Sequence, residues 1–427
     1  MNVLIIGSGG REHAVGWKIK QSDLLNDLYF APGNAGTSDL GENIQVDVND
    51  FESIKSEVLS KQIDLVFVGP EDPLVNGIHD FFLADEELKN IPVIGPQKKG
   101  AWLEGSKEFC KEFMHKSGVP TAAYKAFTAG TYNDGCEFLD SLKSPYVLKA
   151  DGLAAGKGVL ILEDLSEAKA ELKEMLMNAK FGAASAKVVI EEFMHGIELS
   201  VFVLTDGDNY VILPEAKDYK RIGEGDTGLN TGGMGAITPV PFADADFMKR
   251  VETEVVIPTI QGLKDQDIPY KGFLFIGLMN DNGSPRVVEY NVRLGDPETE
   301  VVLPRLKTDL LALFKAVGEG TLGECTVEFD DRAVCTVIMV SGGYPEAYEK
   351  GAEITGFDKT KDSIVFHAGT KMENGKVVTN GGRVLAVSSY GRDFNEALEK
   401  SYVNTALLDY DKKYFRSDLG FDLQKYL

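Results

Sequence analysis

The sequence has few of the residues that build metal clusters and disulfide frameworks. Its 427 residues include five histidines and only four cysteines, Cys110, Cys136, Cys325 and Cys335. None of the cysteines forms a CxxC pair, and the histidines lack the spacing of zinc ligands. A zinc ribbon, a thioredoxin-like site and a disulfide scaffold are therefore excluded, and we expect reduced thiols in a cytoplasmic protein.

Long apolar runs and positive charge are also scarce. The apolar run at 1–6 stops at Gly7, too short for the core of a signal peptide, and no run approaches the ~20 apolar residues of a membrane span. Lys and Arg number 44 against 67 Asp and Glu, so the net charge is −23. A general nucleic-acid binder needs a basic face. We expect neither a membrane nor a nucleic acid as partner, and anionic substrates would require a local basic cluster.

What the chain does have is a regular alternation of strand and helix signals. Strands expected at 3–6, 28–31, 64–68 and 91–94 each end in a loop with Gly or Pro, which predicts a parallel α/β sheet whose loops converge on one crevice. The length indicates about three domains. We place them at 1–103 (parallel α/β), 104–327 (mixed α/β with a small inserted unit at about 125–195) and 328–427 (strand-rich α+β).

The first strand is followed by a glycine-rich turn that contains Gly9 and Gly10. A dinucleotide site is rejected here, because Glu12 stands where GxGxxG needs its third glycine and the second strand ends without an acidic residue. Glycine amides at a helix N-terminus, together with Arg11, fit a single phosphate better.

A second glycine-rich segment, 151–158, contains Gly156 and Lys157. It lacks the first glycine and the Ser or Thr of a Walker A loop, and its simplest interpretation is a hairpin loop between two strands. Lys149 on the strand before the loop and Lys107 further upstream favour a phosphate-binding role over a simple hairpin loop. Both lysines could neutralise the phosphates of a nucleotide as point charges.

The third strand of the inserted unit ends in Glu191, Glu192 and Phe193. The backbone of this strand end could face an adenine edge, and Glu198 shortly after it could bind ribose hydroxyls. The alternative for the two adjacent glutamates is a solvated face. With the lysines and the glycine-rich loop, these residues predict an ATP site.

Glu289 and Asn291 are expected on one face of a strand, opposite an apolar face of Val288, Tyr290 and Val292. Two hard oxygen ligands at i and i+2 suit Mg²⁺, which prefers a few protein oxygens together with phosphate and water. The alternative interpretation is a solvent-facing strand edge.

Directly after that strand, six residues hold Arg293, Gly295, Asp296 and Glu298. Ordinary turns rarely need a guanidinium and two carboxylates in so short a segment, so this one is a candidate catalytic or substrate-binding site.

Two further segments complete the set of candidates. The basic cluster that the acidic background demands lies at 217–221, where Asp218, Lys220 and Arg221 are candidate site residues. Asn230 opens the glycine-rich segment 230–235, which allows close approach of backbone to a ligand.

Taken together, the motifs resemble those of the glycinamide ribonucleotide synthetase family of the ATP-grasp superfamily, and the resemblance runs from end to end. The matching segments are GSGGREH at 7–13, PGNAGT at 32–37, GPEDPLV at 69–75, LEGSK at 103–107, LKADGLAAGKGV at 148–159, NTGGMG at 230–235, RLGDPE at 293–298, HAGTK at 367–371 and TNGGRV at 379–384.

The resemblance implies a parallel α/β amino-terminal domain that binds phosphoribosylamine, a central ATP-grasp region with a mobile lid at about 125–195, and a β-rich carboxy-terminal domain. It implies that glycine is joined to 5-phosphoribosylamine through glycyl phosphate, with ATP as co-substrate and Mg²⁺ or Mn²⁺ as metal. Asn34 and Glu71 then join the substrate-binding residues. In this reaction Arg293 would hold the carboxylate of glycine or the transferring phosphoryl group, and Asp296 would bind the ammonium group of glycine or accept a proton from the attacking amine. It also implies a monomer whose only partners are these small molecules.

Four positions depart from the family's usual pattern. Lys217 and Tyr219 stand where Gln and His are usual, Leu294 replaces Phe, and Glu300 replaces Gln or Met. A tyrosine cannot act as an imidazole base at neutral pH. Two alternatives remain: another ATP-grasp carboxylate–amine ligase with a different donor and acceptor, and a non-catalytic nucleotide sensor.

Overall fold

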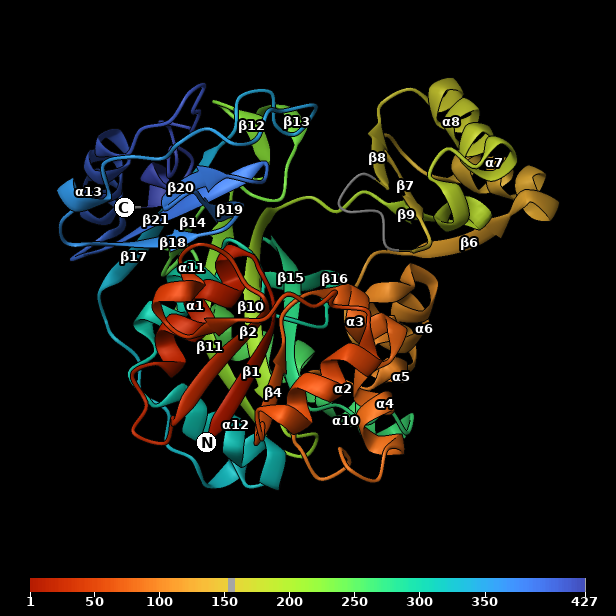
Figure 1. Ribbon diagram of the computed structural model, residues 1–427. Coiled ribbons are helices and arrows are strands. Elements are labelled where there is room, and N and C mark those ends of the chain that lie inside the picture. The colour runs from red at the N-terminus through yellow and green to blue at the C-terminus, as the bar shows by residue number, and fades with distance from the viewer. Residues whose placement is uncertain (153–157, 427) are drawn as a thin grey trace.

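A computed structural model describes residues 1–152 and 158–426 (Figure 1). Its first elements are β1 Asn2–Gly7, α1 Gly10–Ile19, β2 Asp27–Pro32, β3 Glu42–Asn43, α2 Phe51–Ser60, β4 Leu65–Val68, α3 Glu71–Asn76, α4 Ile78–Ala84 and β5 Val93–Ile94. The strands form the expected parallel sheet, in the order β3-β2-β1-β4-β5. Because parallel strands end at the same edge, the loops after β1, β2 and β4 meet there.

The inserted unit is a four-stranded antiparallel sheet in the order β6-β9-β7-β8 with two helices against one face. Helices α5 Lys98–Gly105 and α6 Lys107–Ser117 precede it, and its elements are β6 Tyr124–Thr128, α7 Tyr132–Ser141, β7 Tyr146–Ala150, β8 Val159–Leu162, α8 Leu165–Asn178 and β9 Lys187–Glu192. Asp164 caps α8 by accepting a hydrogen bond from the backbone of Glu167, as their spacing predicts. This unit, called the lid below, projects from the body at the upper right of Figure 1.

One continuous eight-stranded sheet forms the rest of the body, in the order β16-β15-β10-β11-β14-β17-β21-β18. Its strands and the elements around them are β10 Ile197–Thr205, β11 Tyr210–Asp218, β12 Arg221–Gly223, β13 Thr227–Asn230, β14 Gly235–Thr238, α9 Ala245–Val251, a π-helical turn Glu252–Val256, α10 Ile257–Asp265, β15 Gly272–Asp281, β16 Ser284–Asn291, α11 Thr299–Arg305, α12 Leu310–Glu319, β17 Ala333–Val340, β18 Ser363–His367, β19 Thr370–Glu373, β20 Lys376–Thr379, β21 Arg383–Gly391 and α13 Phe394–Leu407. The antiparallel pairing of β14 with β17 carries this sheet across the boundary expected between 327 and 328. Composition along the chain could not show a pairing between strands so far apart in sequence.

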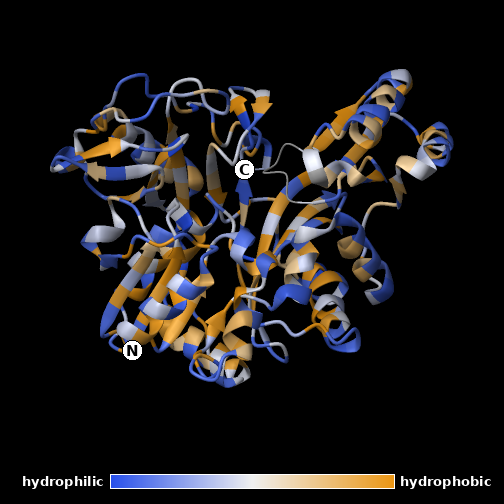
Figure 2. Cartoon of the chain, turned by 45° about the vertical axis from the view of Figure 1, so that its right-hand side comes forward, coloured by the Kyte–Doolittle hydropathy of each residue, from blue (hydrophilic) through white to orange (hydrophobic). Residues whose placement is uncertain are grey.

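The amino-terminal sheet is fixed to the body by aromatic packing. Phe67 on β4 stacks on Phe314 of α12 with ring centroids 5.4 Å apart, and Phe273 of β15 meets both rings edge-on. Such pairs stabilise a core by about 1 kcal/mol beyond the area they bury. Figure 2 shows the apolar residues concentrated on the strands of the sheets, as expected for elements buried on both faces. None of the helices in the described ranges has the length and apolar character needed to cross a bilayer.

Candidate active site

The first glycine-rich turn and the 293–298 segment are brought together around Arg11. The Arg11 guanidinium lies in the first turn of α1, where Nη1 donates to the carbonyl of Leu294 at 3.0 Å and Nε pairs with Glu12 at 2.6 Å. The Arg11 backbone amide faces the Asp296 carboxylate at 3.3 Å. Two of its three guanidinium nitrogens therefore bond within the protein, so this side chain joins domains as well as offering positive charge.

The carboxy-terminal region reaches the same place through Arg383, which sequence reasoning did not single out. Its guanidinium pairs with the Asp296 carboxylate at 2.9 Å and donates to the carbonyls of Asp296 and Gly232 at 2.7 and 2.6 Å. Arg383 stands at the start of β21 in the TNGGRV motif. The motif marked the segment, but only the fold shows that this arginine holds Asp296.

The glycines at this junction allow backbone to come very close to carboxylates. A Cβ at Gly10 would lie 2.2 Å from Oε1 of Glu300, and one at Gly295 would lie 2.4 Å from Oε2 of Glu298. The amide of Gly9 donates to Glu12 at 2.6 Å. Larger residues at these positions would therefore displace the carboxylates.

Arg293 is held by two acidic side chains. It pairs with Glu104 at 2.8 Å and with Glu71 at 3.4 Å, and it donates to Oδ1 of Asn291 at 3.3 Å. Glu104 was not predicted; it also accepts the amide of Val292 at 2.8 Å, and burial raises its pKa to about 7. The network orients the Arg293 guanidinium and leaves part of its fork for an anionic ligand.

A β-bulge at Val288 determines how β16 presents its oxygen ligands. The pairing with β15 shifts between Gly277 and Leu278, so that Val288 is the extra residue. The prediction that Val288 lies on the buried face is wrong: it is half-buried, and Val287 packs into the core with Tyr290 instead. Glu289, beyond the bulge, still shares a face with Asn291 as predicted.

Three lysines surround Glu289. Burial alone would raise the pKa of this carboxyl, but Lys220, Lys149 and Lys107 outweigh burial and lower it. These lysines therefore favour the ionised form of the Glu289 carboxyl. Among the described residues, no group of three or more His, Cys, Asp or Glu could hold a metal ion. Glu289 and Asn291 thus fit a cation that takes its remaining ligands from phosphate and water, as Mg²⁺ does.

Glu191 is the centre of a buried ion cluster beneath the lid sheet. Its Oε2 accepts from Lys149 and from Lys111, both at 3.0 Å, and the side chains of Glu191 and Lys111 are each only 2% exposed. Glu191 and Glu289 outweigh the effect of burial and raise the pKa of Lys149. Among the described residues, Oε1 of Glu191 has no hydrogen-bond partner. Lys111 was missed, because a lysine within an amphipathic helix pattern gives no signal of burial.

The next two residues of the predicted ATP site, Glu192 and Phe193, make contacts within the protein. The Glu192 carboxylate pairs with Arg286, and its amide donates to the carbonyl of Ala123 at 3.0 Å, so this amide is not available to an adenine edge. Phe193 packs edge-on against His195 at 5.0 Å. Gly156 and Lys157 lie outside the described residues.

Glu198, Asp218 and Lys220 form a third charged group near Glu289. Lys220 pairs with Glu198 at 3.1 Å and lowers the pKa of that carboxyl. Asp218 and Glu198 raise the pKa of Lys220 well above its usual value, whereas burial raises the pKa of Asp218. Burial, with Asp218 nearby, raises the pKa of Glu298 to about 7.

The remaining predicted substrate residues have different surroundings. Asn34 donates to the carbonyls of Ser8 and His367 at 2.9 and 2.8 Å and caps its own loop, so it ties the first domain to the carboxy-terminal one. Arg221 and Asn230 are exposed cross-strand partners on the β12–β13 hairpin, where Arg221 bonds to the carbonyl of Gly228 at 2.8 Å.

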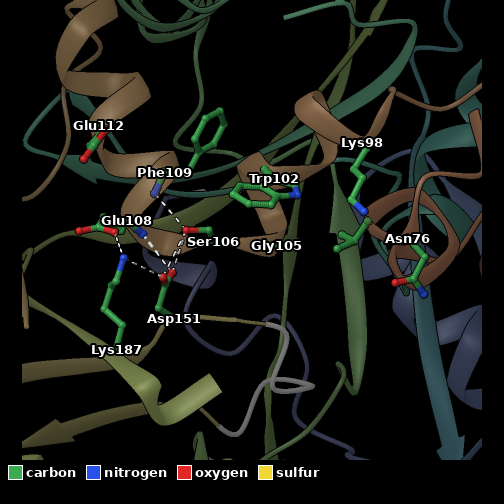
Figure 3. A pocket seen from close by; sticks show the side chains of 11 residues that line it. Asn76, Lys98, Trp102, Gly105, Ser106, Glu108, Phe109, Glu112, Asp151 and Lys187 are labelled. Carbon is green, nitrogen blue, oxygen red and sulfur yellow. Dashed lines mark hydrogen bonds and ion pairs between the residues drawn. The ribbon is translucent and has the colours of Figure 1, made fainter. Parts of the chain in front are cut away.

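Lys107 is the first residue of α6, where this helix meets the lid. Its ammonium donates to the carbonyl of Gly152 at 2.8 Å, Ser106 donates to Asp151 at 3.0 Å, and Glu108 pairs with Lys187. Figure 3 shows the neighbouring contacts between Ser106 and Asp151 and between Glu108 and Lys187. Beside these contacts is a pocket of about 600 Å³, lined by Val75, Asn76, Lys98, Trp102, Gly105, Ser106, Glu108, Phe109, Glu112, Asp151 and Lys187.

The sequence is similar to known proteins along nearly its whole length. Models of phosphoribosylglycinamide synthetase match at residues 1–104 (N domain), 105–299 (ATP-grasp A domain) and 334–422 (C domain). Phosphoribosylamine–glycine ligase of Caldanaerobacter subterraneus subsp. tengcongensis is 43% identical over 420 residues, 98% of this chain and 99% of that protein. A bifunctional purine biosynthetic protein of Pichia angusta is 45% identical over 98% of this chain, which spans only 53% of that relative's length.

A solved structure gives the same result in three dimensions. The crystal structure of phosphoribosylamine–glycine ligase from Thermotoga maritima is similar to this one with a TM-score of 0.85 at 36% sequence identity, and the match covers 98% of this chain and 100% of that one. Fold and sequence agree over nearly the whole chain, and the chain belongs to the phosphoribosylglycinamide synthetase family.

Proposed function

We propose that this protein joins glycine to 5-phosphoribosylamine at the expense of ATP, giving glycinamide ribonucleotide, ADP and phosphate. One observation carries the proposal: the Arg11 turn, the strand end with Glu289 and Asn291, and Arg383 converge on the 293–298 segment. Each comes from a different matched domain of the family. The named relatives are phosphoribosylamine–glycine ligases.

Chemical activation explains why a nucleotide is needed. A carboxylate is a poor acyl donor, because its leaving group would be an oxide ion. Transfer of the γ-phosphoryl group of ATP to glycine gives glycyl phosphate, and phosphate leaves when the amine of phosphoribosylamine attacks the carbonyl. The first step brings two anions together, and we assign Lys107, Lys149 and Lys220, which surround Glu289, to offset their repulsion.

A divalent cation fits the Glu289–Asn291 pair by the chemistry of its donors. Mg²⁺ or Mn²⁺ bound there would supply positive charge to the phosphate oxygens during transfer. Arg293, which bonds to Asn291, lies beside this pair, and we assign it to the anionic end of glycine or to the phosphoryl group.

Asp296 is assigned to the ammonium group of glycine. Both of its oxygens already face N–H donors, from Arg383 at 2.9 Å and from the Arg11 amide at 3.3 Å. A carboxylate surrounded by donors is suited to bind a cation more than to accept a proton. Contacts from Lys107 and Ser106 to Gly152 and Asp151 couple the lid to the body, where closure would protect glycyl phosphate from water.

Release of ADP from ATP and Mg²⁺ tests the function, with glycine and freshly made phosphoribosylamine added separately and together. We expect ADP only with both substrates, matched by glycinamide ribonucleotide. Turnover with another carboxylate and amine would refute the substrates while keeping the ligase chemistry. Tight ATP binding without turnover, whichever carboxylate and amine are supplied, would refute the proposal that the protein is an enzyme.

A further inference from the structure

The extended segment 217–220, which is the end of β11 and the two residues after it, carries Asp218 and Lys220 on one side. The carboxy-terminal segment holds it from the other side. Tyr219 is 1% exposed, and its hydroxyl donates to Oδ1 of Asp422 and accepts the amide of Gly420, both at 2.9 Å. Lys217 pairs with Oδ2 of Asp422 at 3.2 Å and lies 4.0 Å from the centre of the Tyr219 ring. Each oxygen of the Asp422 carboxylate therefore holds one side chain of this strand.

Strand geometry separates these contacts from the site. Lys217 and Asp218 pair with β14, and the Tyr219 amide extends the ladder by donating to the carbonyl of Gly235 at 3.0 Å. Side chains alternate along an extended strand, so Lys217 and Tyr219 lie on one side and Asp218 and Lys220 on the other. On that other side, Lys220 pairs with Glu198.

The same carboxy-terminal segment holds the hairpin that follows the strand. Arg416 is fully buried, pairs with Asp226 at 2.6 Å and with Asp418 at 2.8 Å, and lies 5.4 Å from the centre of the Tyr219 ring. Asp418 in turn accepts the amide of Gly225 at 2.7 Å. The strand is thus fixed both at Tyr219 and beyond it.

We propose that Asp422 is a positioning residue for the ligation: through Lys217 and Tyr219 it fixes the strand that presents Asp218 and Lys220 toward Glu198 and Glu289. The inference rests on the proposed function. Both of these contacts of Asp422 involve positions where the chain departs from the family's usual residues. Asp422 gives both departures a common partner, which explains why a lysine and a tyrosine are accommodated together.

A matched pair of variants separates positioning from stability. Tyr219→Phe removes a hydroxyl bonded to Asp422, whereas Tyr410→Phe removes the hydroxyl of another buried tyrosine, which donates to the carbonyl of Val340 at 2.9 Å. Both should lower Tm by a similar amount. We expect Tyr219→Phe to lower kcat by about tenfold to hundredfold, as expected for catalytic groups displaced by up to ~1 Å. Its KM for ATP should change far less, and Tyr410→Phe should keep wild-type kcat.

Substitutions at Asp422 give a graded test of the same idea. Asp422→Asn keeps an acceptor for Tyr219 but loses the charge that pairs with Lys217, and Asp422→Ala loses both. We expect kcat to decrease in the order wild type, Asp422→Asn, Asp422→Ala, with a changed pH profile of kcat as Lys220 shifts relative to Asp218. Tyr219→Phe carries the test if Asp422→Ala does not fold.

Wild-type kcat in both Tyr219→Phe and Asp422→Asn would overturn the proposal, as would an equal loss of kcat in Tyr410→Phe. The proposed function fails in a different way, because the wild type itself would then release no ADP with glycine and phosphoribosylamine. The two failures are therefore distinguishable in one set of assays.

Discussion

Replacing Glu191 by glutamine should destabilise the fold by about 4 kcal/mol although the side chain keeps its shape. Glu191 is the shared partner of Lys111 and Lys149, each 3.0 Å from the same oxygen, and the three side chains are 2 to 6% exposed. Removing one partner of a buried ion pair costs about 3–5 kcal/mol, because the remaining charge stays buried without compensation.

Two opposing effects place the value near the middle of that range. Two ammonium groups lose their partner at once, and they then repel each other without an intervening carboxylate. The glutamine carbonyl can still accept one hydrogen bond, which offsets about 1 kcal/mol of the loss. Together these effects give the value of about 4 kcal/mol.

Urea unfolding of the wild type, Glu191→Gln and Glu192→Gln measures this difference. Glu192 is the matched control, because it is the adjacent residue and pairs with Arg286, but its side chain is 38% exposed. Exposed pairs contribute about 0–1 kcal/mol, so Glu192→Gln should change stability by less than 1 kcal/mol. Equal losses in the two variants would refute the explanation by burial.

The pH dependence gives a second check with a defined sign. Burial already lowers the pKa of Lys111, and removing the carboxylate should lower it further below the ~10.4 of an unfolded lysine. The unfolded variant then binds more protons than the folded one below pH ~10.4, so its stability rises with pH. The deficit of Glu191→Gln should therefore shrink between about pH 7 and pH 10. A constant deficit would contradict the buried ammonium groups as its cause.

Further variants test the site and the junction between domains. Glu289→Ala should nearly abolish turnover with the fold intact, and near-normal activity at ordinary Mg²⁺ would remove it as a metal ligand. Arg11→Met should raise the KM for phosphoribosylamine far more than that for ATP and also lower Tm, because its buried guanidinium bonds across domains; equal effects on both KM values would contradict a phosphate role. Asp296→Asn should lower glycine-dependent turnover by about tenfold or more, as for the loss of a charged hydrogen bond, and unchanged kinetics would eliminate its assignment. Burial lowers the pKa of His13 to about 3 and of His367 to about 4. The unfolded chain, with histidine pKa near ~6.5, binds more protons between that pH and pH 4. Stability should therefore fall on acidification through this window, and His13→Gln should flatten the slope in urea titrations at several pH values.

Local signals were sufficient for most of the elements. The strands expected at 3–6, 28–31, 64–68 and 91–94 are confirmed as β1, β2, β4 and β5, with ends that differ by at most two residues, because runs of β-branched residues flanked by turn formers leave little choice. Periodicity failed at Val288, where one extra residue in the strand reverses which side chains are buried.

Candidate site residues could be found in the sequence where they sit in short, chemically dense motifs. The 293–298 segment and the Glu289–Asn291 pair are such cases, and the structure joins the 293–298 segment to Arg11. Glu104, Lys111 and Arg383 were missed because each acts through a partner far away in sequence, on another element. Spacing along a chain carries no information about which buried charge faces which.

Lys217 and Tyr219 show how far this limit extends. Considered without the fold, they indicate a loss of function in the 217–221 cluster, because lysine replaces the usual glutamine and tyrosine replaces the usual histidine. The fold supplies an acidic partner more than 200 positions later, and the aspartate satisfies both residues with one carboxylate. A buried ammonium or phenol is costly when unpaired and stabilising when paired. The two departures are therefore better understood as one coupled change around a shared partner, Asp422. The Tyr219→Phe and Tyr410→Phe pair measures the effect of this contact on kcat directly.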